Sequence, residues 1–477
     1  MSTLSPHSDS LVAEMTHTLR VVQAFDRALV ADVAADDDGA LEKKLVAAAE
    51  AMRNRDGWLK PHQRSAVLQR AASLLEARQD PFVTLIAREG GKPASDAAAE
   101  VIRAIDGLRN AAEALRTFAG REIPMGLTPA SERRWAFTTK EPIGVVAAIS
   151  AFNHPLNLIV HQVAPAIAVG CAVIVKPAAA TPLSCLELVK LFREAGLDEA
   201  WCQTFITDDN VLAERLATDS RIAFLSFIGS ARVGWHLHSR LSPGTRCALE
   251  HGGAAPVIVD RSANVDAVIE PIVKGGYYHA GQVCVSTQRI FVHQEIIGGF
   301  VERLTARVGR LRVGDPLRRE TEVGPLIDPR ETVRVASWLE EATSRGARLF
   351  GGGRYSETTL MPAVVVEPPA DAKVSQLEIF GPVTCVYGFQ ELDRAIDTAN
   401  ALPFAFQVSI FSTDIAPALR AAERLDASCV LINDHTAFRT DWMPFAGRRQ
   451  SGYGVGGIPA SMEDMSQEKM VVLRHEM

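Results

Sequence analysis

The sequence has little of what marks a membrane, secreted or nucleic-acid-binding protein. No apolar run approaches the roughly 20 residues that a helix needs to cross a bilayer. The first ten residues, MSTLSPHSDS, lack a basic start followed by an apolar core, so no signal peptide is expected. The net charge is −7 and the two signs are interspersed, which offers no basic surface to nucleic acid or an anionic membrane. We therefore expect a cytoplasmic protein without nucleic-acid or membrane partners.

Cysteine is too scarce and too scattered for a disulfide framework. The chain has seven cysteines, an odd number, and no two of them form a C-x-x-C pair. Such spacing is typical of a reducing compartment and provides no zinc site. Two histidine pairs, His154 with His161 and His236 with His238, have no acidic or cysteine partner at ligand spacing. We therefore expect no metal.

The apolar pattern predicts an α/β protein. The chain has 477 residues, of which 47% are apolar and 22% charged, as in an ordinary globular protein of several domains. We interpret residues 1–20 as a polar extension, and the pattern from about residue 40 to 115 as helical. Continuous apolar runs then alternate with helical segments, which predicts a parallel sheet covered on both faces. The continuous apolar runs are Val145–Ile149 and Ala172–Val175, and the strand-helix pattern continues through Cys202–Phe205 and Ile222–Ile228.

A second α/β block is predicted from about residue 252 to 433. Its candidate strands are Val257–Val259, Ile290–Val292, Thr384–Val386 and Val430–Ile432. Two further strands stand outside both blocks. Arg134–Thr139 alternates polar and apolar residues, and Lys469–Leu473 is a short apolar run near the end of the chain. A lone terminal strand would leave an open edge, so we expect it to pair with the strand at Arg134–Thr139 or with a second subunit.

One cysteine, Cys284, stands out by its surroundings. It follows Ala280 and Gly281 in the segment GGYYHAGQVCVSTQRIFV and precedes a β-type run. Glycine there allows the backbone to come close to a bound group, and a thiolate is a strong nucleophile. A lone cysteine is more often a buried structural residue, so the interpretation depends on other parts of the chain.

Three segments could supply what a cysteine nucleophile needs. Asn153 follows the predicted strand that ends at Ile149, where parallel sheets place ligands, and its amide could donate to an oxyanion. Glu250 stands beside two glycines and could act as a base for water. The third segment, Gly229-Ser230, follows a strand at a predicted helix start, which suits phosphate. Each has an ordinary alternative, namely a turn asparagine, a solvated glutamate and a capped helix.

A second glycine motif does not support dinucleotide binding. Gly452, Gly454 and Gly457 match G-x-G-x-x-G. No strand is predicted before them, and Pro459 stands where a helix should open. The motif therefore lacks the context that its function requires.

Taken together, these segments resemble the aldehyde dehydrogenase superfamily over nearly the whole chain. In family order they are AFNHPLN, VIVKPA, FIGSARVG, LEHGG, GQVC, EIFGP and PFAGRRQSGYG. The resemblance implies a Rossmann-type cofactor domain (residues 1–122 and 141–251), an α/β catalytic domain (252–445) and a small β oligomerisation unit (123–140 and 446–477). It also implies a homodimer or homotetramer, in which the terminal strand would be a donated edge.

The resemblance implies a role for each motif residue. Cys284 would attack the aldehyde carbon, while Asn153 and the Cys284 main-chain N–H would hold the oxyanion. Glu250 would activate water to release the acid. On the cofactor side, Lys176 would bind the adenosine ribose, Ser230 the pyrophosphate and Glu378 the nicotinamide ribose. The other implied cofactor-binding residues are Phe380, beside the nicotinamide ring, and Ile149, Phe152 and Gly229.

The cofactor preference and the substrate depend on departures from the family pattern. Ala179 stands where the family often has a glutamate that favours NAD over NADP, so either cofactor is open. Residues before Phe445 look similar to the branch that oxidises small anionic or hydroxylated aldehydes, including phosphonoacetaldehyde and lactaldehyde. By position, Arg103, His154 and Arg439 could hold an anion. Surface pairing is the alternative for the two arginines. Val283 replaces an arginine of that group, which leaves room for a less charged aldehyde.

Two other functions remain open on the same fold. One is a CoA-acylating dehydrogenase, which has no use for a water-activating base such as Glu250. The other is a non-catalytic binding protein, which could lose Cys284, Asn153 or Glu250 without harm. All three residues are present, so we predict an NAD(P)-dependent aldehyde dehydrogenase that releases a free acid.

Overall fold

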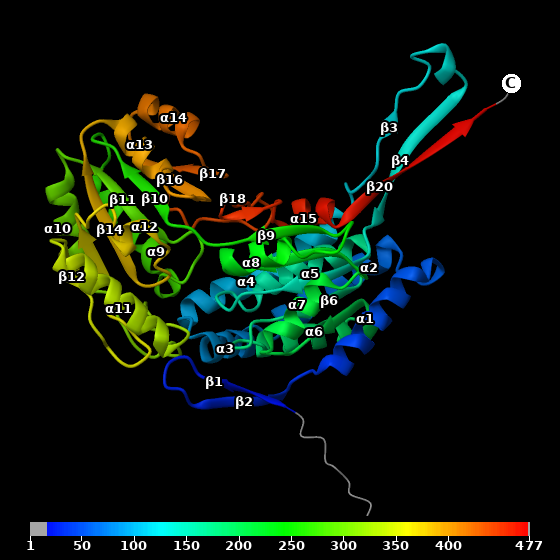
Figure 1. Cartoon of the computed structure of the whole chain (residues 1–477), viewed down its shortest axis with the longest axis horizontal. Coiled ribbons are helices and arrows are strands. Elements are labelled where there is room, and N and C mark those ends of the chain that lie inside the picture. The colour runs from blue at the N-terminus through cyan, green and yellow to red at the C-terminus, as the bar shows by residue number, and fades with distance from the viewer. Residues whose placement is uncertain (1–16, 476–477) are drawn as a thin grey trace, which may run out of the picture.

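The computed structural model describes residues 17–475 and consists of two α/β blocks with a thin β arm (Figure 1). Residues 1–16 of the predicted polar extension lie outside the described residues. Thr18–Val22 is strand β1, paired with β2 (Leu29–Ala34). The predicted extension was therefore three residues too long, because the strand starts at Thr18 and Leu19 and Val21 alternate into the protein interior.

The first sheet has six strands in the order β19-β9-β8-β5-β6-β7. All pairs are parallel except β19 with β9. All four predicted strands form, and β5 and β8 have the predicted bounds. Their residues are apolar on both faces because helices cover both sides of the sheet. The strands are β5 (Val145–Ile149), β6 (Val173–Lys176), β7 (Cys202–Thr204), β8 (Ile222–Ile228), β9 (Arg246–Glu250) and β19 (Gly452–Tyr453).

Helix α5 (Asn157–Val169) is central to this block, since all thirteen of its residues are buried. It starts just after the turn that follows β5, so its position fixes that turn against the sheet. The other helices of this half are α1 (Asp38–Arg53), α2 (Pro61–Glu76), α3 (Gln79–Gly90), α4 (Ala94–Ala114), α6 (Leu183–Glu194), α7 (Asn210–Thr218) and α8 (Ala231–His238), with short 3-10 turns η1 (Arg55–Gly57) and η3 (Glu199–Trp201). A further 3-10 turn, η2 (Pro129–Ser131), belongs to the β arm.

The second sheet has seven strands in the order β12-β13-β14-β11-β10-β16-β17, and only the edge strand β12 is antiparallel. The strands are β10 (Ala255–Val259), β11 (Thr287–His293), β12 (Arg348–Gly351), β13 (Ala363–Val366), β14 (Val383–Phe389), β16 (Gln407–Phe411) and β17 (Cys429–Ile432). The helices are α9 (Val265–Tyr277), α10 (Ile297–Val308), α11 (Pro329–Ser344), α12 (Lys373–Gln376), α13 (Leu392–Asn400) and α14 (Ile415–Arg424), with η4 (Tyr278–Gly281).

The β arm comprises β3 (Glu122–Ile123), β4 (Arg134–Pro142) and β20 (Ser466–Arg474). Of the two pairings predicted for the terminal strand, the structure has the one with the Arg134–Thr139 segment. β20 is antiparallel to β4, in register from Ser466 with Pro142 to Arg474 with Arg134. The arm projects away from both blocks (Figure 1). β20 is an edge strand, and three of its apolar side chains are exposed: Met470, Val472 and Leu473.

The segment before the arm corrects one expectation. Helix α15 (Ile458–Asp464) opens directly after Gly457, with Pro459 in its first turn, and packs on α5. We expected Pro459 to prevent a helix there, but proline is well suited to a first turn, where its missing N–H has no acceptor anyway. Before it, β18 (Arg448–Arg449) pairs with β15 (Phe404–Ala405). Within residues 17–475 no helix is long and apolar enough to cross a bilayer.

Candidate active site

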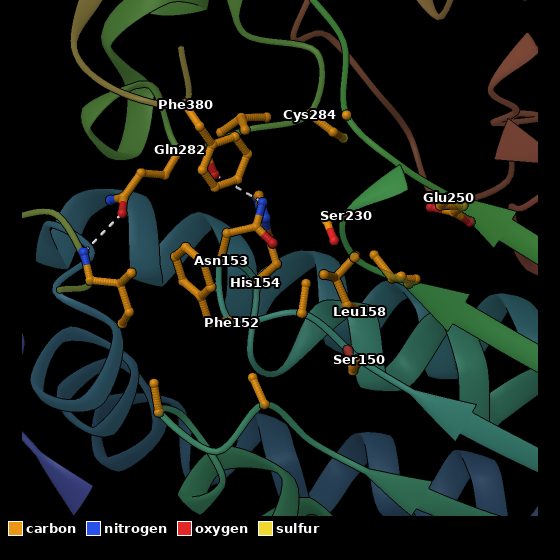
Figure 2. Close-up of a pocket in the computed structure, with 18 of the residues that line it drawn as sticks. Ser150, Phe152, Asn153, His154, Leu158, Ser230, Glu250, Gln282, Cys284 and Phe380 are labelled. Atoms are coloured by element: carbon orange, nitrogen blue, oxygen red, sulfur yellow. Dashed lines mark hydrogen bonds between the residues drawn. The ribbon is translucent and has the colours of Figure 1, made fainter. Parts of the chain in front are cut away.

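A cavity of about 770 Å³ lies where the carboxyl ends of β5, β8 and β9 face the loop after η4 (Figure 2). It brings together nearly all of the predicted site residues. Lys176 is the exception. The predicted residues that line the cavity are Arg103, Ile149, Phe152, Asn153, His154, Gly229, Ser230, Glu250, Cys284, Glu378, Phe380 and Arg439.

Cys284 follows the tightly wound turn η4 (Tyr278–Gly281). His279, Ala280 and Gly281 all have positive φ, and two of these are non-glycine residues in the left-handed region. Gln282 ties the loop to its neighbours, since its amide donates to Pro325 O and accepts from Ile327 N. Asn153 Nδ2 donates to the main-chain oxygen of Gln282 at 2.9 Å (Figure 2). The predicted oxyanion donor is therefore fixed two residues from the cysteine.

The thiol of Cys284 is protonated at neutral pH in this arrangement. Burial raises its pKa to about 12, and the negative charge of Glu250 adds to the increase, while Arg439 opposes it. The thiolate is the reactive form. A reaction at this site must therefore remove the thiol proton as the sulfur attacks.

Glu250 is the last residue of β9, paired with Ile228 on one side and Gly452 on the other. This pairing directs it to the cavity from the first sheet, while Cys284 enters from the second block (Figure 2). Burial raises the pKa of Glu250, and the charge of Arg439 opposes this increase. A carboxylate with a raised pKa is a better proton acceptor than an ordinary glutamate, as a base for water requires.

The cofactor side of the cavity fits a dinucleotide. Ser230 is the N-cap of α8, yet its hydroxyl makes no hydrogen bond to its own helix and is free for a phosphate. Glu378 accepts from Gly253 N at 3.1 Å, and a side chain at Gly252 would collide with its carboxylate. Burial raises the pKa of Glu378 to about 7. Phe152 and Phe380 meet edge to face, 5.9 Å between ring centres, and form an aromatic wall.

Lys176 ends β6, but its side chain does not line the cavity. Its Nζ donates to the main-chain oxygen of Pro177 at 3.3 Å. Burial lowers its pKa, and Asp208 opposes that change. The cavity wall is formed instead by the next residues, Ala178, Ala179 and Ala180.

The other end of the cavity carries a cation without a carboxylate partner of its own. The Arg439 guanidinium lies 3.6 Å from the centre of the Phe445 ring and donates to His161 Nδ1 at 3.2 Å. Its Nε is buried and has no hydrogen-bond partner in the described structure. Arg103, by contrast, is paired with Asp441 at 2.7 Å. Asp441 also accepts from Asn157 and His161, and its pKa lies well below the usual range.

His154 lies beside these arginines as a neutral ring. It is buried, and both burial and the charges of Lys92 and Arg103 hold its pKa well below the usual range. Its Nε2 lies 3.4 Å from the hydroxyl of Tyr278, which also lines the cavity. A neutral histidine can give or accept a hydrogen bond but cannot neutralise an anion.

The residues of the site that were not predicted include Tyr278, Gln282, Asp441 and Phe445. Tyr278 and Gln282 stand in the segment around Cys284, so nearness in sequence was a usable signal for both. Asp441 contacts Arg103 and His161 across about 280 to 340 positions, and no local pattern marks such a contact.

The described residues contain no group of three or more histidine, cysteine, aspartate or glutamate side chains that could hold a metal.

Comparisons with known proteins agree with this geometry. Residues 11–471 match the aldehyde dehydrogenase family. A 3-sulfolactaldehyde dehydrogenase of Priestia aryabhattai is 35% identical over 441 residues, 92% of this chain and 91% of the relative. The structure of aldehyde dehydrogenase 21 from Physcomitrella patens, in complex with the reaction product succinate, has a TM-score of 0.93 and 31% identity over 97% of this chain and 96% of its own.

A second solved structure is a glyceraldehyde-3-phosphate dehydrogenase of Methanocaldococcus jannaschii complexed with NADP. Its TM-score is 0.91 and its identity 30%, over 96% of this chain and 99% of its own. The resemblance seen in the motifs, and the α/β fold that it implied, are confirmed. The chain belongs to the aldehyde dehydrogenase family and is an enzyme that oxidises an aldehyde with a nicotinamide cofactor.

Proposed function

We propose that this enzyme oxidises a small anionic aldehyde to its carboxylic acid through a covalent intermediate on Cys284. The observation that carries the proposal is the composition of one cavity. It holds a thiol, a fixed amide donor and a carboxylate, and its far end holds the guanidinium of Arg439, whose Nε has no hydrogen-bond partner among the described residues. These are the parts that acyl chemistry on an anionic substrate requires.

Cys284 is the nucleophile in this proposal. Its sulfur bonds to the aldehyde carbon as the thiol proton passes to a water molecule in the cavity, and the carbonyl oxygen becomes an oxyanion. Asn153 retains one amide hydrogen beyond the bond to Gln282, because a primary amide has two. That hydrogen and the main-chain N–H of Cys284 hold the oxyanion. The Arg439 charge favours the thiolate, since it lowers the pKa of Cys284.

The residues on the other side of the cavity would hold NAD or NADP. Ser230, at the start of α8 after Gly229, would take the pyrophosphate, and Glu378 the nicotinamide ribose. Ile149, Phe152 and Phe380 would enclose the remainder, and Lys176 would reach the adenosine ribose by turning from Pro177. When bound, the oxidised nicotinamide would accept a hydride from the substrate carbon. Ala179 leaves no negative charge against a 2′-phosphate, so we propose that NADP is tolerated.

Glu250 releases the product as a free acid. After hydride removal the acyl group is a thioester on Cys284, and water attacks its carbonyl carbon while Glu250 takes the water proton. The Cys284 thiolate then leaves. A raised pKa suits Glu250 to this step. Acyl transfer to CoA does not require a base that activates water, so we propose hydrolysis as the reaction in preference to CoA acylation.

Arg439 binds the substrate anion, with Arg103 and His154 beside it. Arg103 is balanced by Asp441, whereas Arg439 has a buried nitrogen without an acceptor. A buried unsatisfied donor is unfavourable, and an anionic substrate group would satisfy it. One unpaired guanidinium matches one negative charge, as on a carboxylate or sulfonate. The relative from Priestia acts on an aldehyde named for a sulfo group, which agrees with this class.

We also propose a homodimer or homotetramer assembled through the β arm. Within residues 17–475 the outer edge of β20 has no strand partner, and Met470, Val472 and Leu473 are exposed on this strand. A second subunit would cover this edge. Replacing Met470 and Leu473 with glutamate should reduce the mass measured by light scattering, whereas Gln467→Glu on the same strand should not.

All seven cysteines are free thiols, which favours a reducing compartment such as the cytoplasm.

One experiment tests the reaction. Absorbance of the reduced nicotinamide is followed with sulfonated, carboxylated and neutral aldehydes of similar size, with NAD or NADP, and with or without CoA. We expect turnover without CoA and a higher kcat/KM for the anionic aldehydes. Strict dependence on CoA would favour the acylating reaction instead. No signal with any aldehyde would contradict the proposal.

A further inference from the structure

The loop that carries Glu378 and Phe380 is held in a strained conformation. Phe380 has φ of +49°, in the left-handed region that a bulky residue rarely occupies. Such a conformation persists only where surrounding groups enforce it. The loop joins α12 to β14, and both Glu378 and Phe380 line the cavity. Whatever enforces the backbone of this loop therefore also sets the wall of the cofactor site.

Gln288 is the first of these groups. It lies on β11, four residues after Cys284, and is buried. Its Nε2 donates to Leu377 O at 2.7 Å and to Val374 O at 3.1 Å, and its Oε1 accepts from Ile379 N at 2.9 Å. One side chain thus holds the backbone on both sides of Glu378.

Arg334 is the second group and approaches the loop from α11. It donates to Ile379 O at 2.7 Å. Its guanidinium is itself held in place, since it lies 4.7 Å from the centre of the Trp338 ring and pairs with Glu331 at 2.7 Å. Ile379 is therefore bonded at its N–H by Gln288 and at its oxygen by Arg334. Both peptide groups around the residue between Glu378 and Phe380 are fixed.

The same loop also touches the loop that bears the nucleophile. A side chain at Gly281 would collide with the main-chain oxygen of Gly381, so only glycine permits this approach. Gln282, on the other side of Cys284, binds the Pro325–Ile327 loop in a matching way. Two glutamines, one on each side of the cysteine, thus connect the nucleophile segment to two different walls of the cavity.

We infer that Gln288 and Arg334 are positioning residues for cofactor binding, which lock Ile379 so that Glu378 and Phe380 face the nicotinamide ribose and ring. This rests on the proposed function of the cavity. Gln288 does not line the cavity, so any effect of it on the cofactor must pass through the loop. The chemistry of Cys284 with a substrate that needs no cofactor requires no contact with Glu378 or Phe380. Loss of the hydrogen bonds from Gln288 or Arg334 to the loop should therefore weaken nucleotide binding more than it weakens ester hydrolysis at Cys284.

The test compares Gln288→Leu with Gln376→Leu. Gln376 is an exposed glutamine in α12, just before the same loop, and bonds only to the main chain of Ala370. Dissociation constants for NAD and NADP are measured by calorimetry on the protein without substrate. Cysteine-dependent hydrolysis of p-nitrophenyl acetate is measured without nucleotide. We expect Gln288→Leu to raise the nucleotide dissociation constant roughly tenfold while ester hydrolysis changes little, because three backbone groups, two of them in buried hydrogen bonds, lose their partner. Gln376→Leu should resemble the wild type in both.

Arg334 gives an independent arm that remains informative if Gln288→Leu does not fold. Arg334 also lines the cavity, and its charge lowers the pKa of Glu378. Arg334→Met, which loses both the charge and the bond to Ile379 O, is therefore compared with Arg334→Gln, which loses the charge but keeps a donor. We expect weaker nucleotide binding in the first and partial recovery in the second. Unchanged dissociation constants in Gln288→Leu and Arg334→Met would overturn the inference. Equal loss of nucleotide binding and ester hydrolysis would do the same, since that pattern indicates general damage to the fold. A wild-type protein that hydrolyses the ester but oxidises no aldehyde would instead contradict the proposed function.

Discussion

Asn153 donates its side-chain amide to the main-chain oxygen of Gln282, 2.9 Å away, although 129 positions separate the two residues in the chain. The bond joins the turn after β5 to the loop that bears Cys284. It therefore places an amide beside the nucleophile before any substrate arrives. Groups that are fixed in advance stabilise a developing charge without reorganisation, which is the largest single contribution in many enzymes.

Replacing Asn153 with alanine should lower kcat by roughly a hundredfold or more, the usual cost of one oxyanion donor. The measurement is steady-state reduction of the nicotinamide with the best aldehyde of the panel. Gln203→Ala serves as the control, because Gln203 is a buried side-chain amide of β7 that donates to Lys44 O away from the cavity. An Asn153→Ala enzyme that keeps its kcat would show that the oxyanion is held elsewhere.

Arg439 should govern affinity for anionic aldehydes. Arg439→Met removes the charge but keeps an apolar side chain against Phe445, so KM should rise about tenfold or more for a sulfonated or carboxylated aldehyde and little for a neutral one. Arg103→Met is the comparison, and we expect a smaller effect, because Arg103 is already paired with Asp441. Equal changes for anionic and neutral aldehydes would remove the anion site from the account.

The sequence predicted the framework of the site better than its contacts. Val145–Ile149 and Ile222–Ile228 were predicted with their exact bounds because strands buried on both faces are continuous apolar runs. The cavity brings together Cys284, Asn153 and Glu250, the motif residues to which the family resemblance assigns catalytic roles.

The remainder depends on contacts that no local pattern encodes. The orientation of the Lys176 side chain toward Pro177 and the pairing of Asp441 with Arg103 both follow from tertiary packing. The helix after Gly457 was missed for a local reason, since Pro459 was interpreted as a helix breaker although it stands in a first turn.

The thiol of Cys284 should react with iodoacetamide faster as the pH rises. Because its pKa is raised to about 12, the thiolate fraction grows roughly tenfold per unit from about pH 7 to about pH 10. Glu250→Gln removes a negative neighbour, lowers this pKa and should speed the reaction at a given pH, whereas Arg439→Met should slow it. Mass spectrometry of the Cys284 peptide measures the rate. A rate that does not change with pH would indicate a thiolate already formed.

Ala179 should control tolerance of NADP. Ala179→Glu places a carboxylate in the cavity wall, and repulsion from the 2′-phosphate should raise the KM for NADP about tenfold more than that for NAD. Ala179→Gln has nearly the same size without the charge and should show a smaller preference. If the glutamate variant changed both KM values equally, the adenosine ribose would have to bind elsewhere.

The most direct test of the account is the behaviour of Glu250→Gln when it is mixed with an aldehyde and the oxidised nucleotide. We expect a burst of about one reduced nicotinamide per site, followed by slow turnover, because the acyl group forms on Cys284 but water is no longer activated. The mass of the protein should rise by that of the acyl group, and the added mass should map to Cys284. Continued turnover at the wild-type rate, or a burst without a covalent adduct on Cys284, would contradict the account.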